Sequence, residues 1–232
     1  MKIRIKFKKT GIMKFIGHLD VMRYFQKVNR RAGVDIVFSG GFSPHQVMSF
    51  AAPLGLGLTS QGEYLDMEVN SCESSESMIR KMNDVMADGM EILSFRLLPD
   101  QAKPAMSVVA AADYFLKPRE NIWDNWQKDM ETFFQQENIR VLKKTKKNEK
   151  EIDIRPLIYN WQMEENGVRL ILAAGSMDNL KPELLLEAFF RYTGRDYIPH
   201  CFFIHRLELY AWSGDGEDRK LKALEDFGED IL

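Results

Sequence analysis

Histidines near a glycine-rich segment are the residues of this chain most suited to chemistry. His18 and Asp20 stand in Gly17-His-Leu-Asp20, and His45 follows Pro44. Histidine is the side chain whose ordinary pKa lies nearest neutrality, so His18 or His45 could serve as a general acid or base. The structural alternative is a histidine that only forms hydrogen bonds near a helix start, beside an Asp20 that favours the positive end of the helix dipole.

Four cationic side chains share one face of the helix that we expect over residues 18–32. They stand at i, i+4, i+7 and i+8 with no acid among them, and they are Arg23, Lys27, Arg30 and Arg31. Such a stripe suits contacts with a nucleic-acid backbone, and a solvated helix face is the alternative. Residues 1–50 hold ten Lys/Arg against two Asp/Glu, although the whole chain has a net charge of −2. This asymmetry favours an anionic partner for the N-terminal half.

The segment Phe38-Ser-Gly-Gly-Phe-Ser-Pro-His45 follows this helix. Gly40 and Gly41 permit backbone N–H groups to converge on an anion, and Phe42 could stack on a base. We therefore add these three residues to the predicted nucleic-acid interface. The alternative is a tight connection whose phenylalanines lie in the core. A second basic run, Lys143-Lys-Thr-Lys-Lys147, is expected at a solvated hairpin tip, with RNA contact as its alternative.

Cysteine and histidine usage argues against a metal site or a cofactor. Cys72 and Cys201 are the two cysteines, and they stand far apart in the chain. His200 and His205 project to opposite faces of an ideal strand, which does not suit one shared metal ion. The chain has no signal-peptide pattern and no apolar run long enough to span a bilayer. We predict a soluble, cytoplasmic protein without a bound metal.

Hydrophobic periodicity predicts the same order of elements in both halves. Strands are expected at 2–8, 47–50, 63–69 and 91–97 around helices at 18–32 and 74–87; in the second half, strands or hairpins are expected at 108–116, 140–157, 167–173 and 201–212 around helices at 120–136 and 181–192. A β-α-β-β-α-β order in each half indicates an α+β protein with two tandem ferredoxin-like domains. We predict domains at residues 1–103 and 104–213, followed by a solvated acidic tail at 214–232.

The first strand alternates apolar and basic side chains without interruption. Ile3, Ile5 and Phe7 face one way, and Lys2, Arg4, Lys6 and Lys8 face the other. The basic face could bind phosphates. The alternative is pairing with the strand expected at 63–69, which presents Tyr64, Asp66 and Glu68.

Several of these segments resemble a bacterial family of unknown function, the radical-SAM-associated or radical-SAM-linked proteins. The resemblance rests on Lys14-Phe-Ile-Gly-His-Leu-Asp20, Asn29-Arg-Arg-Ala-Gly33, Phe38–His45, Ser49-Phe-Ala-Ala-Pro-Leu-Gly55 and Gly62-Glu-Tyr-Leu-Asp66. It implies a functional link to a B12-binding radical SAM protein, and it implies no activity or catalytic residue. Two cysteines cannot hold a [4Fe–4S] cluster, so radical chemistry would belong to another polypeptide.

The favoured hypothesis is a non-catalytic partner of a radical SAM enzyme that binds or presents RNA for modification. The first alternative is a metal-independent RNA-processing enzyme that uses His18 or His45. The second is a protein-interaction module that binds no nucleic acid.

Overall fold

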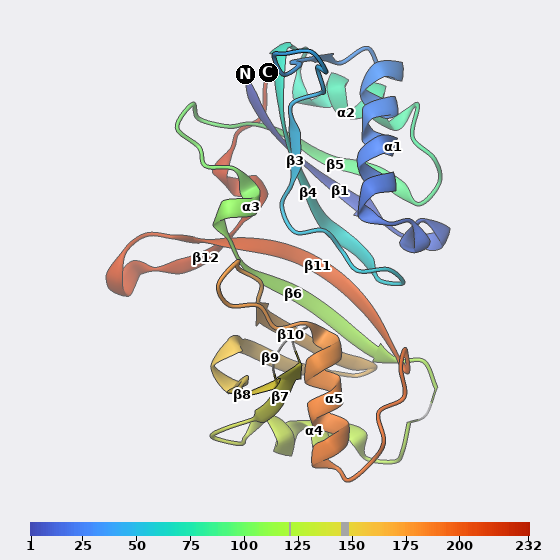
Figure 1. Cartoon of the computed structure of the whole chain (residues 1–232), viewed down its shortest axis with the longest axis vertical. Helices are drawn as coiled ribbons and strands as arrows, with labels where there is room; N and C mark the ends of the chain where they lie inside the picture. Colours follow the sequence, from blue (N-terminus) through green and yellow to red (C-terminus); the bar gives the residue numbers. More distant parts are fainter. Residues whose placement is uncertain (121, 145–148) are drawn as a thin grey trace. The chain divides into compact units, whose positions relative to one another are not determined.

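The computed structural model describes residues 1–120, 122–144 and 149–232. The chain contains helices together with strands that pair antiparallel, so the predicted α+β class is confirmed (Figure 1). The chain forms two compact units: residues 1–110 together with 206–232, and residues 111–205. Of the basic run expected at a hairpin tip, residues 145–147 lie outside the described part.

The sheet of the first unit is built around β1 (Lys2–Lys9). This strand pairs antiparallel with β5 (Met90–Leu97) on one side and with β4 (Thr59–Ser71) on the other. Two short strands, β2 (Asp35–Ile36) and β3 (Met48–Phe50), pair with the far edge of β4. The chain therefore follows the predicted order of elements through residue 97, with β3 at the position of the strand predicted at 47–50 and β2 as an additional short strand before it.

Two helices cover one face of this sheet. They are α1 (His18–Arg31) and α2 (Ser75–Asn83), which begins after the N-cap Ser74. Together with the apolar side of β1, they enclose one core that contains Ile3, Ile5, Phe7, Val21, Phe25, Val28, Met78 and Met82. The β1 alternation thus serves burial on one face, as predicted.

A spacing of three residues in Leu19, Met22, Phe25 and Val28 predicts an apolar stripe along the first helix, and this prediction is wrong at its start. Leu19 is 59% exposed, and the buried positions are Val21, Phe25, Val28 and Asn29. Val21, Phe25 and Val28 stand at i, i+4 and i+7, which is the spacing that keeps side chains on one face of an α-helix. The three-residue spacing that includes Leu19 drifts away from that face.

The C-terminal segment is part of the first unit and not a solvated tail. β11 (Phe202–Ser213) pairs with β4, and β12 (Lys220–Ala223) pairs with residues 210–213 of β11. A Cβ on Gly62 of β4 would lie 2.6 Å from the Glu208 Cα atom, so this close approach of strands requires glycine. Leu224, in the short helix η4 (Leu224–Phe227), is fully buried.

The units therefore differ from the predicted boundaries 1–103, 104–213 and 214–232. The chain leaves the first unit near residue 110, returns to it at residue 206 and stays there to its end. Backbone pairing explains the return: Ser75 N–H bonds to the Ile231 carbonyl at 2.9 Å, and Leu97 and Glu229 exchange backbone bonds. A solvated tail would have left these groups to water.

The second unit also combines antiparallel strands with two helices. β10 (Gly167–Ala173) lies between β6 (Val109–Pro118) and β9 (Ile158–Glu164), antiparallel to both. β7 (Arg140–Lys144) and β8 (Glu149–Asp153) form a separate hairpin. The helices are α4 (Trp126–Phe134) and α5 (Pro182–Tyr192), and their aromatic rings pack together, as in the pair Phe133 and Phe189 at 5.6 Å. The remaining short helices are α3 (Ala105–Val108), η1 (Gly11–Phe15), η2 (Arg155–Leu157) and η3 (Gly216–Asp218).

Candidate nucleic-acid interface

The solvent face of α1 carries the four predicted cations. All four side chains are exposed. Arg23 pairs with Asp20 at 3.4 Å, one turn earlier on the same helix. Among the residues that the structure describes, no carboxylate lies within ion-pair distance of Lys27, Arg30 or Arg31. The second half of the helix therefore presents positive charge that the protein itself leaves available for an anion.

The glycine-rich segment forms a narrow loop with Phe42 at its exposed tip. Phe38 and Gln46 pair at the base, and Ser39 N–H bonds to the His45 carbonyl at 2.8 Å. Gly41 has a φ of +98°, a conformation that favours glycine. The Phe42 ring is fully exposed, so the alternative that placed it in the core is wrong.

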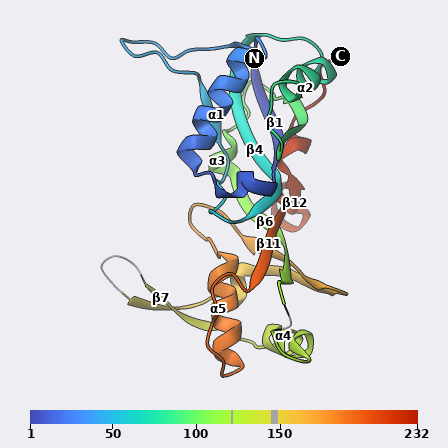
Figure 2. The same cartoon turned by 90° about the vertical axis from the view of Figure 1, so that its right-hand side faces the viewer.

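The base of this loop is attached to the basic helix. The buried Asn29 of α1 donates its side-chain amide to the Gln46 side-chain oxygen at 3.0 Å. Gln46 in turn donates to the Gln26 carbonyl at 3.2 Å. Figure 2 shows the segment between β2 and β3 extending outward beside α1. The fold thus brings the loop and the second half of α1 together, as a shared interface requires.

The three candidate catalytic residues are not brought together. His18 is the first residue of α1, is exposed, and packs its ring edge against Phe50 with 5.3 Å between ring centroids. His45 lies at the loop base, where its Nδ1 hydrogen-bonds with the Ser39 hydroxyl at 2.8 Å. Gln26, which anchors that base, stands eight residues beyond His18, or about 12 Å along the helix axis. Asp20 is engaged with Arg23.

The basic face of β1 is largely paired within the first unit. Arg4 forms two hydrogen bonds with the Asp66 carboxylate, at 2.7 and 2.9 Å, and Lys8 pairs with Glu91. This confirms the cross-strand alternative for Arg4. Lys6 instead pairs with Glu208 and Glu225, both at 2.6 Å.

These partners of Lys6 change its pKa. Burial acts to lower the pKa of Lys6, but hydrogen bonds to Glu208 and Glu225 outweigh it and raise that pKa. Burial also raises the pKa of Tyr64, whose hydroxyl donates to Glu208 at 2.6 Å. The cations Arg4, Lys6 and Lys8 on the basic side of β1 therefore already have carboxylate partners. They are poorly available to bind phosphates.

A second charged cluster lies on the opposite, helix-covered side of the sheet. Lys9, Glu63 and Arg206 are only 3%, 5% and 3% exposed. Glu63 accepts the Arg206 Nε at 3.0 Å, and Arg206 also donates to the Ala52 carbonyl at 2.7 Å. The sequence analysis missed this cluster. Its one signal is that Lys9 follows Lys8 and so breaks the alternation, on the side of Ile3, Ile5 and Phe7.

Residues 2–182 match a known protein family. They match the family described as an uncharacterized protein conserved in bacteria (DUF2344). The chain belongs to this family. The matched range includes α1, the glycine-rich loop and the Lys9 and Glu63 positions, whereas Arg206 and the C-terminal segment lie beyond it. No curated protein matches the chain.

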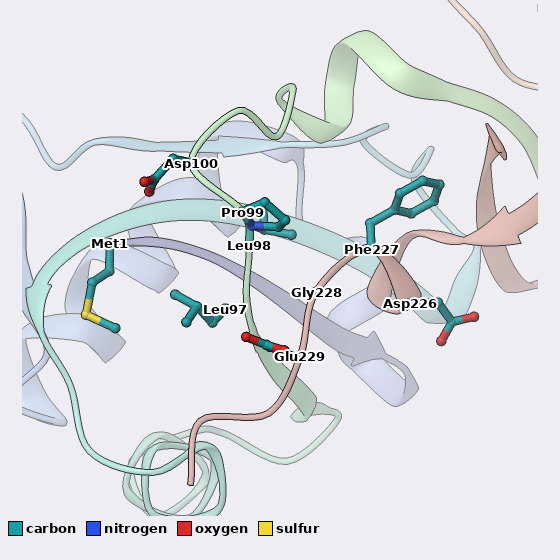
Figure 3. A pocket seen from close by; sticks show the side chains of 9 residues that line it. All are labelled: Met1, Leu97, Leu98, Pro99, Asp100, Asp226, Phe227, Gly228 and Glu229. Atoms are coloured by element: carbon teal, nitrogen blue, oxygen red, sulfur yellow. The ribbon is translucent and has the colours of Figure 1, made fainter. Parts of the chain in front are cut away.

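One cavity of this DUF2344 protein has no lining residue from α1. It has a volume of about 590 Å³ and lies between the end of β5 and residues 226–229 (Figure 3). Its acidic side chains are Asp100, Asp226 and Glu229, which Figure 3 shows spread around the cavity. Within the described ranges, no three His, Cys, Asp or Glu side chains gather closely enough to hold a metal ion. No helix in those ranges has the length and apolar character needed to cross a bilayer.

Proposed function

We propose that this DUF2344 protein is a non-catalytic partner of a radical SAM enzyme that binds or presents RNA for modification. The RNA contact would be made by α1 and the glycine-rich loop, through Lys27, Arg30, Arg31 and Phe42. Catalysis would remain with the radical SAM protein, which the resemblance in the N-terminal segments suggests is a B12-binding enzyme of the bacterial cytoplasm.

One observation supports the RNA contact above all others. Three exposed cations, which have no ion-pair partner within the described ranges of the chain, stand on the helix that anchors a loop with a fully exposed phenylalanine. Cations in register along a helix suit successive phosphates, and an exposed ring suits stacking on an unpaired base. The alternative of a solvated helix face does not explain why the loop attached to α1 exposes the Phe42 ring.

The salt dependence of RNA binding tests this proposal. We expect the affinity for single-stranded RNA to fall steeply with salt, because each phosphate contact releases counterions. Lys27→Ala with Arg30→Ala should lower the slope of log K against log salt by about 1.4, which is about 0.7 for each lost single-strand contact. Fluorescence anisotropy with a labelled oligonucleotide over a series of salt concentrations measures that slope.

A matched control comes from the other helix of the same unit. Arg80→Ala with Lys81→Ala removes two exposed cations from α2 and should leave the slope unchanged. Equal losses in both variants would indicate a general charge effect and contradict a specific interface. Absence of RNA binding at low salt, with or without the radical SAM partner, would refute the RNA proposal.

The partnership is supported by exposed apolar side chains at the start of α1. Ile12, Phe15, Leu19 and Leu56 are 59–79% exposed, and the Gly57 N–H bonds to the Lys14 carbonyl at 2.9 Å, which ties the loop of Leu56 to η1. Apolar groups clustered on a surface are typical of protein contact sites. Co-purification with the radical SAM protein from the same bacterium should succeed for the natural chain and fail for Phe15→Ser with Leu19→Ser.

We also propose that each of the two units has a ferredoxin-like fold, which would position the residues of the RNA contact. In the first unit, the order β5-β1-β4 with β2 and β3 beyond β4 supports it. In the second unit, the order β6-β10-β9 supports it, and the inserted β7-β8 hairpin is a departure from the simplest form.

The enzyme alternative predicts a different result. Metal-independent RNA cleavage that disappears in His18→Ala or His45→Ala would establish a nuclease and exclude the non-catalytic proposal. We expect no cleavage by the purified protein, because the two histidines stand apart and His45 is engaged with Ser39.

A further inference from the structure

The sheet of the second unit has one face that points away from α4. The ring of Trp161 in β9 stacks on Phe134 of α4, with 5.0 Å between the ring centroids. Phe202 of β11 packs against Trp126 of the same helix at 5.7 Å. Side chains alternate between the two faces of a strand, so the neighbours of these strand residues lie on the opposite face. Those neighbours are Asn160, Gln162 and Phe203.

Strand register brings further side chains to this open face in rows. Gln162 of β9 lies opposite Arg169 of β10, which in turn lies opposite Phe115 of β6. In the next row, Asn160 lies opposite Ile171. Asn160, Gln162 and Arg169 are exposed, and Phe115 is half-buried. The open face therefore presents amide, guanidinium and aromatic groups to solvent, as an antiparallel sheet with one solvated face allows.

Arg169 is held in a defined orientation on the open face. Its Nε donates to both oxygens of Asp113 at 3.1 and 3.0 Å, and its Nη2 donates to the same carboxylate at 2.6 Å. Asp113 is fully buried, whereas the Arg169 side chain is 45% exposed. A guanidinium fixed in this way offers its plane for stacking on a nucleobase and its edge for hydrogen bonds. The pair thus presents a preoriented cation to a ligand.

Two half-buried phenylalanines contribute aromatic surface. The ring of Phe115 lies over Gly167, where an added Cβ would be 2.6 Å from the ring. Phe203 lies beneath the Arg119 guanidinium at 5.9 Å, and Arg119 and Lys117 are exposed. Open sheet faces that combine aromatic rings with cations are a recurrent surface for single-stranded RNA, because bases stack on the rings and the cations meet phosphates.

A hollow on this face leaves room for a small planar group. Its volume is about 190 Å³, below the range of about 300–1,000 Å³ that encloses drug-sized ligands. Its lining residues are Asn160, Trp161, Gln162, Arg169 and Ile171. Side-chain amides both donate and accept hydrogen bonds, which suits the edge of an unpaired base.

The charges around the hollow favour an anionic ligand. Lys117 and Arg169 are exposed cations of these strands, and Arg119 adds a third above Phe203. Among the described residues of β6, β9 and β10 that point to this face, Glu164 is the exposed acid. A surface for docking another protein would be expected to expose a contiguous apolar patch instead.

We propose that the open face of the second unit is a further contact for single-stranded RNA. One base occupies the hollow beside Gln162 and Arg169, a neighbouring base stacks on Phe115, and Lys117 and Arg119 meet phosphates. This inference rests on the proposed function, because it takes RNA as the ligand. It adds a binding surface on the second unit to the contact made by α1 and the glycine-rich loop.

Phe115→Leu tests the stacking contact in the full chain. Leucine keeps an apolar side chain over Gly167 but removes the ring, so affinity for a labelled single-stranded RNA should fall at least about fivefold. The slope of log K against log salt should not change, because no charge is lost. Fluorescence anisotropy measures both quantities. Tyr192→Leu, which removes a 44% exposed ring from α5, is the matched control and should bind like the natural chain. Unchanged affinity in Phe115→Leu, or an equal loss in the control, would overturn the inference.

Gln162→Glu keeps the test decisive if Phe115→Leu does not fold. The position is exposed, so stability should change little, and the added carboxylate at the hollow should weaken RNA binding several-fold. Gln135→Glu makes the same change of charge at the exposed end of α4 and should leave binding unchanged. If both variants lose affinity equally, or neither does, the open face is not an RNA contact.

Photo-crosslinking separates this inference from the proposed function. The natural chain is irradiated with a single-stranded RNA that contains 4-thiouridine, and mass spectrometry locates the cross-linked peptides. We expect cross-links within residues 113–119 or 160–171 as well as within 23–46. Cross-links confined to 23–46 would overturn this inference and leave the proposed function intact. Cross-links confined to the second unit would support this inference and contradict the contact at α1, and a chain that binds no RNA would overturn both.

Discussion

The cations on the two sides of β1 differ in whether a carboxylate contacts them directly. Arg4 and Lys6 each contact carboxylates directly, whereas Lys9 is buried with a single long bond to a carbonyl. The difference follows from the side of the strand on which each side chain lies. The side chains of Arg4 and Lys6 meet Asp66 and Glu208. Lys9 lies on the helix-covered side, where Glu63 already accepts hydrogen bonds from Arg206. Lys9 is therefore the residue of this strand whose charge opposes folding.

That position predicts how stability depends on pH. Burial lowers the pKa of Lys9 below 10.5 in the folded chain, so the unfolded chain binds more protons between the lowered value and 10.5. Stability attributable to Lys9 should therefore rise with pH through this window. Lys6 has a raised pKa and acts oppositely, losing its contribution as the pH rises above 10.5.

Urea unfolding of the natural chain and Lys9→Met isolates the Lys9 effect. The stability advantage of Lys9→Met should be largest at neutral pH and should shrink as the pH approaches 10.5. Lys9→Met should then be at least as stable as the natural chain at pH 7. A variant that is less stable at every pH would mean that the bond to Ile16 outweighs desolvation.

At the scale of elements, the glycine-rich loop depends on α1 for its position. Gln46 is 7% exposed and connects the loop to both Asn29 and Gln26. Asn29 is fully buried, and its side-chain oxygen has no hydrogen-bond partner in the described structure. The connection therefore rests on Gln46.

Replacing Gln46 should separate stability from binding. Gln46→Ala should cost about 1–3 kcal/mol, because it leaves the buried Asn29 amide without its acceptor. It should also weaken RNA binding if the loop must be held beside α1.

Phe42→Ala is the comparison: thermal stability should stay within about 0.5 kcal/mol, because the ring is exposed. RNA affinity should fall by about 1–3 kcal/mol for one lost stacking contact. If both variants bind RNA normally, the loop takes no part in the interface.

At the scale of the whole molecule, the C-terminal segment completes the first unit. The Leu224 carbonyl accepts from Arg4 at 3.1 Å, Glu225 pairs with Lys6, and the Ile231 N–H donates to the Ser75 hydroxyl at 2.9 Å. The segment thus covers the charged side of the sheet and also reaches the start of α2.

Removal of residues 214–232 should therefore destabilise the protein. Arg4, Lys6 and Ser75 would each lose a partner, at about 1–3 kcal/mol for each buried group left unsatisfied. Urea or thermal unfolding measures the loss. Asp215→Ser with Asp218→Ser is the control, since these exposed changes should stay within about 0.5 kcal/mol each. An equally stable truncated chain would mean that the segment behaves as a solvated tail.

Local patterns explain what could be predicted from the sequence. Alternation in residues 2–8 identified β1, periodicity placed α2 within residues 74–87, and residues 167–173 matched β10. The basic stripe was also recognised, whereas Phe42 was left open between a stacking residue and a core residue, and its exposure came from the structure. Strand alternation, helix spacing and capping involve residues within a few positions of one another, so the sequence by itself determined these elements and the cations on α1.

Only the tertiary structure decided which charges are paired. Arg206 stands 143 residues beyond Glu63, and Glu225 stands 219 beyond Lys6, so no local spacing indicates either pair. Their meeting depends on β11 adding to β4 and on the chain returning to the first unit. Strand order and register determine these contacts because they bring distant backbones within hydrogen-bonding distance. For the same reason, Lys9 became visible as a buried cation only in the folded chain.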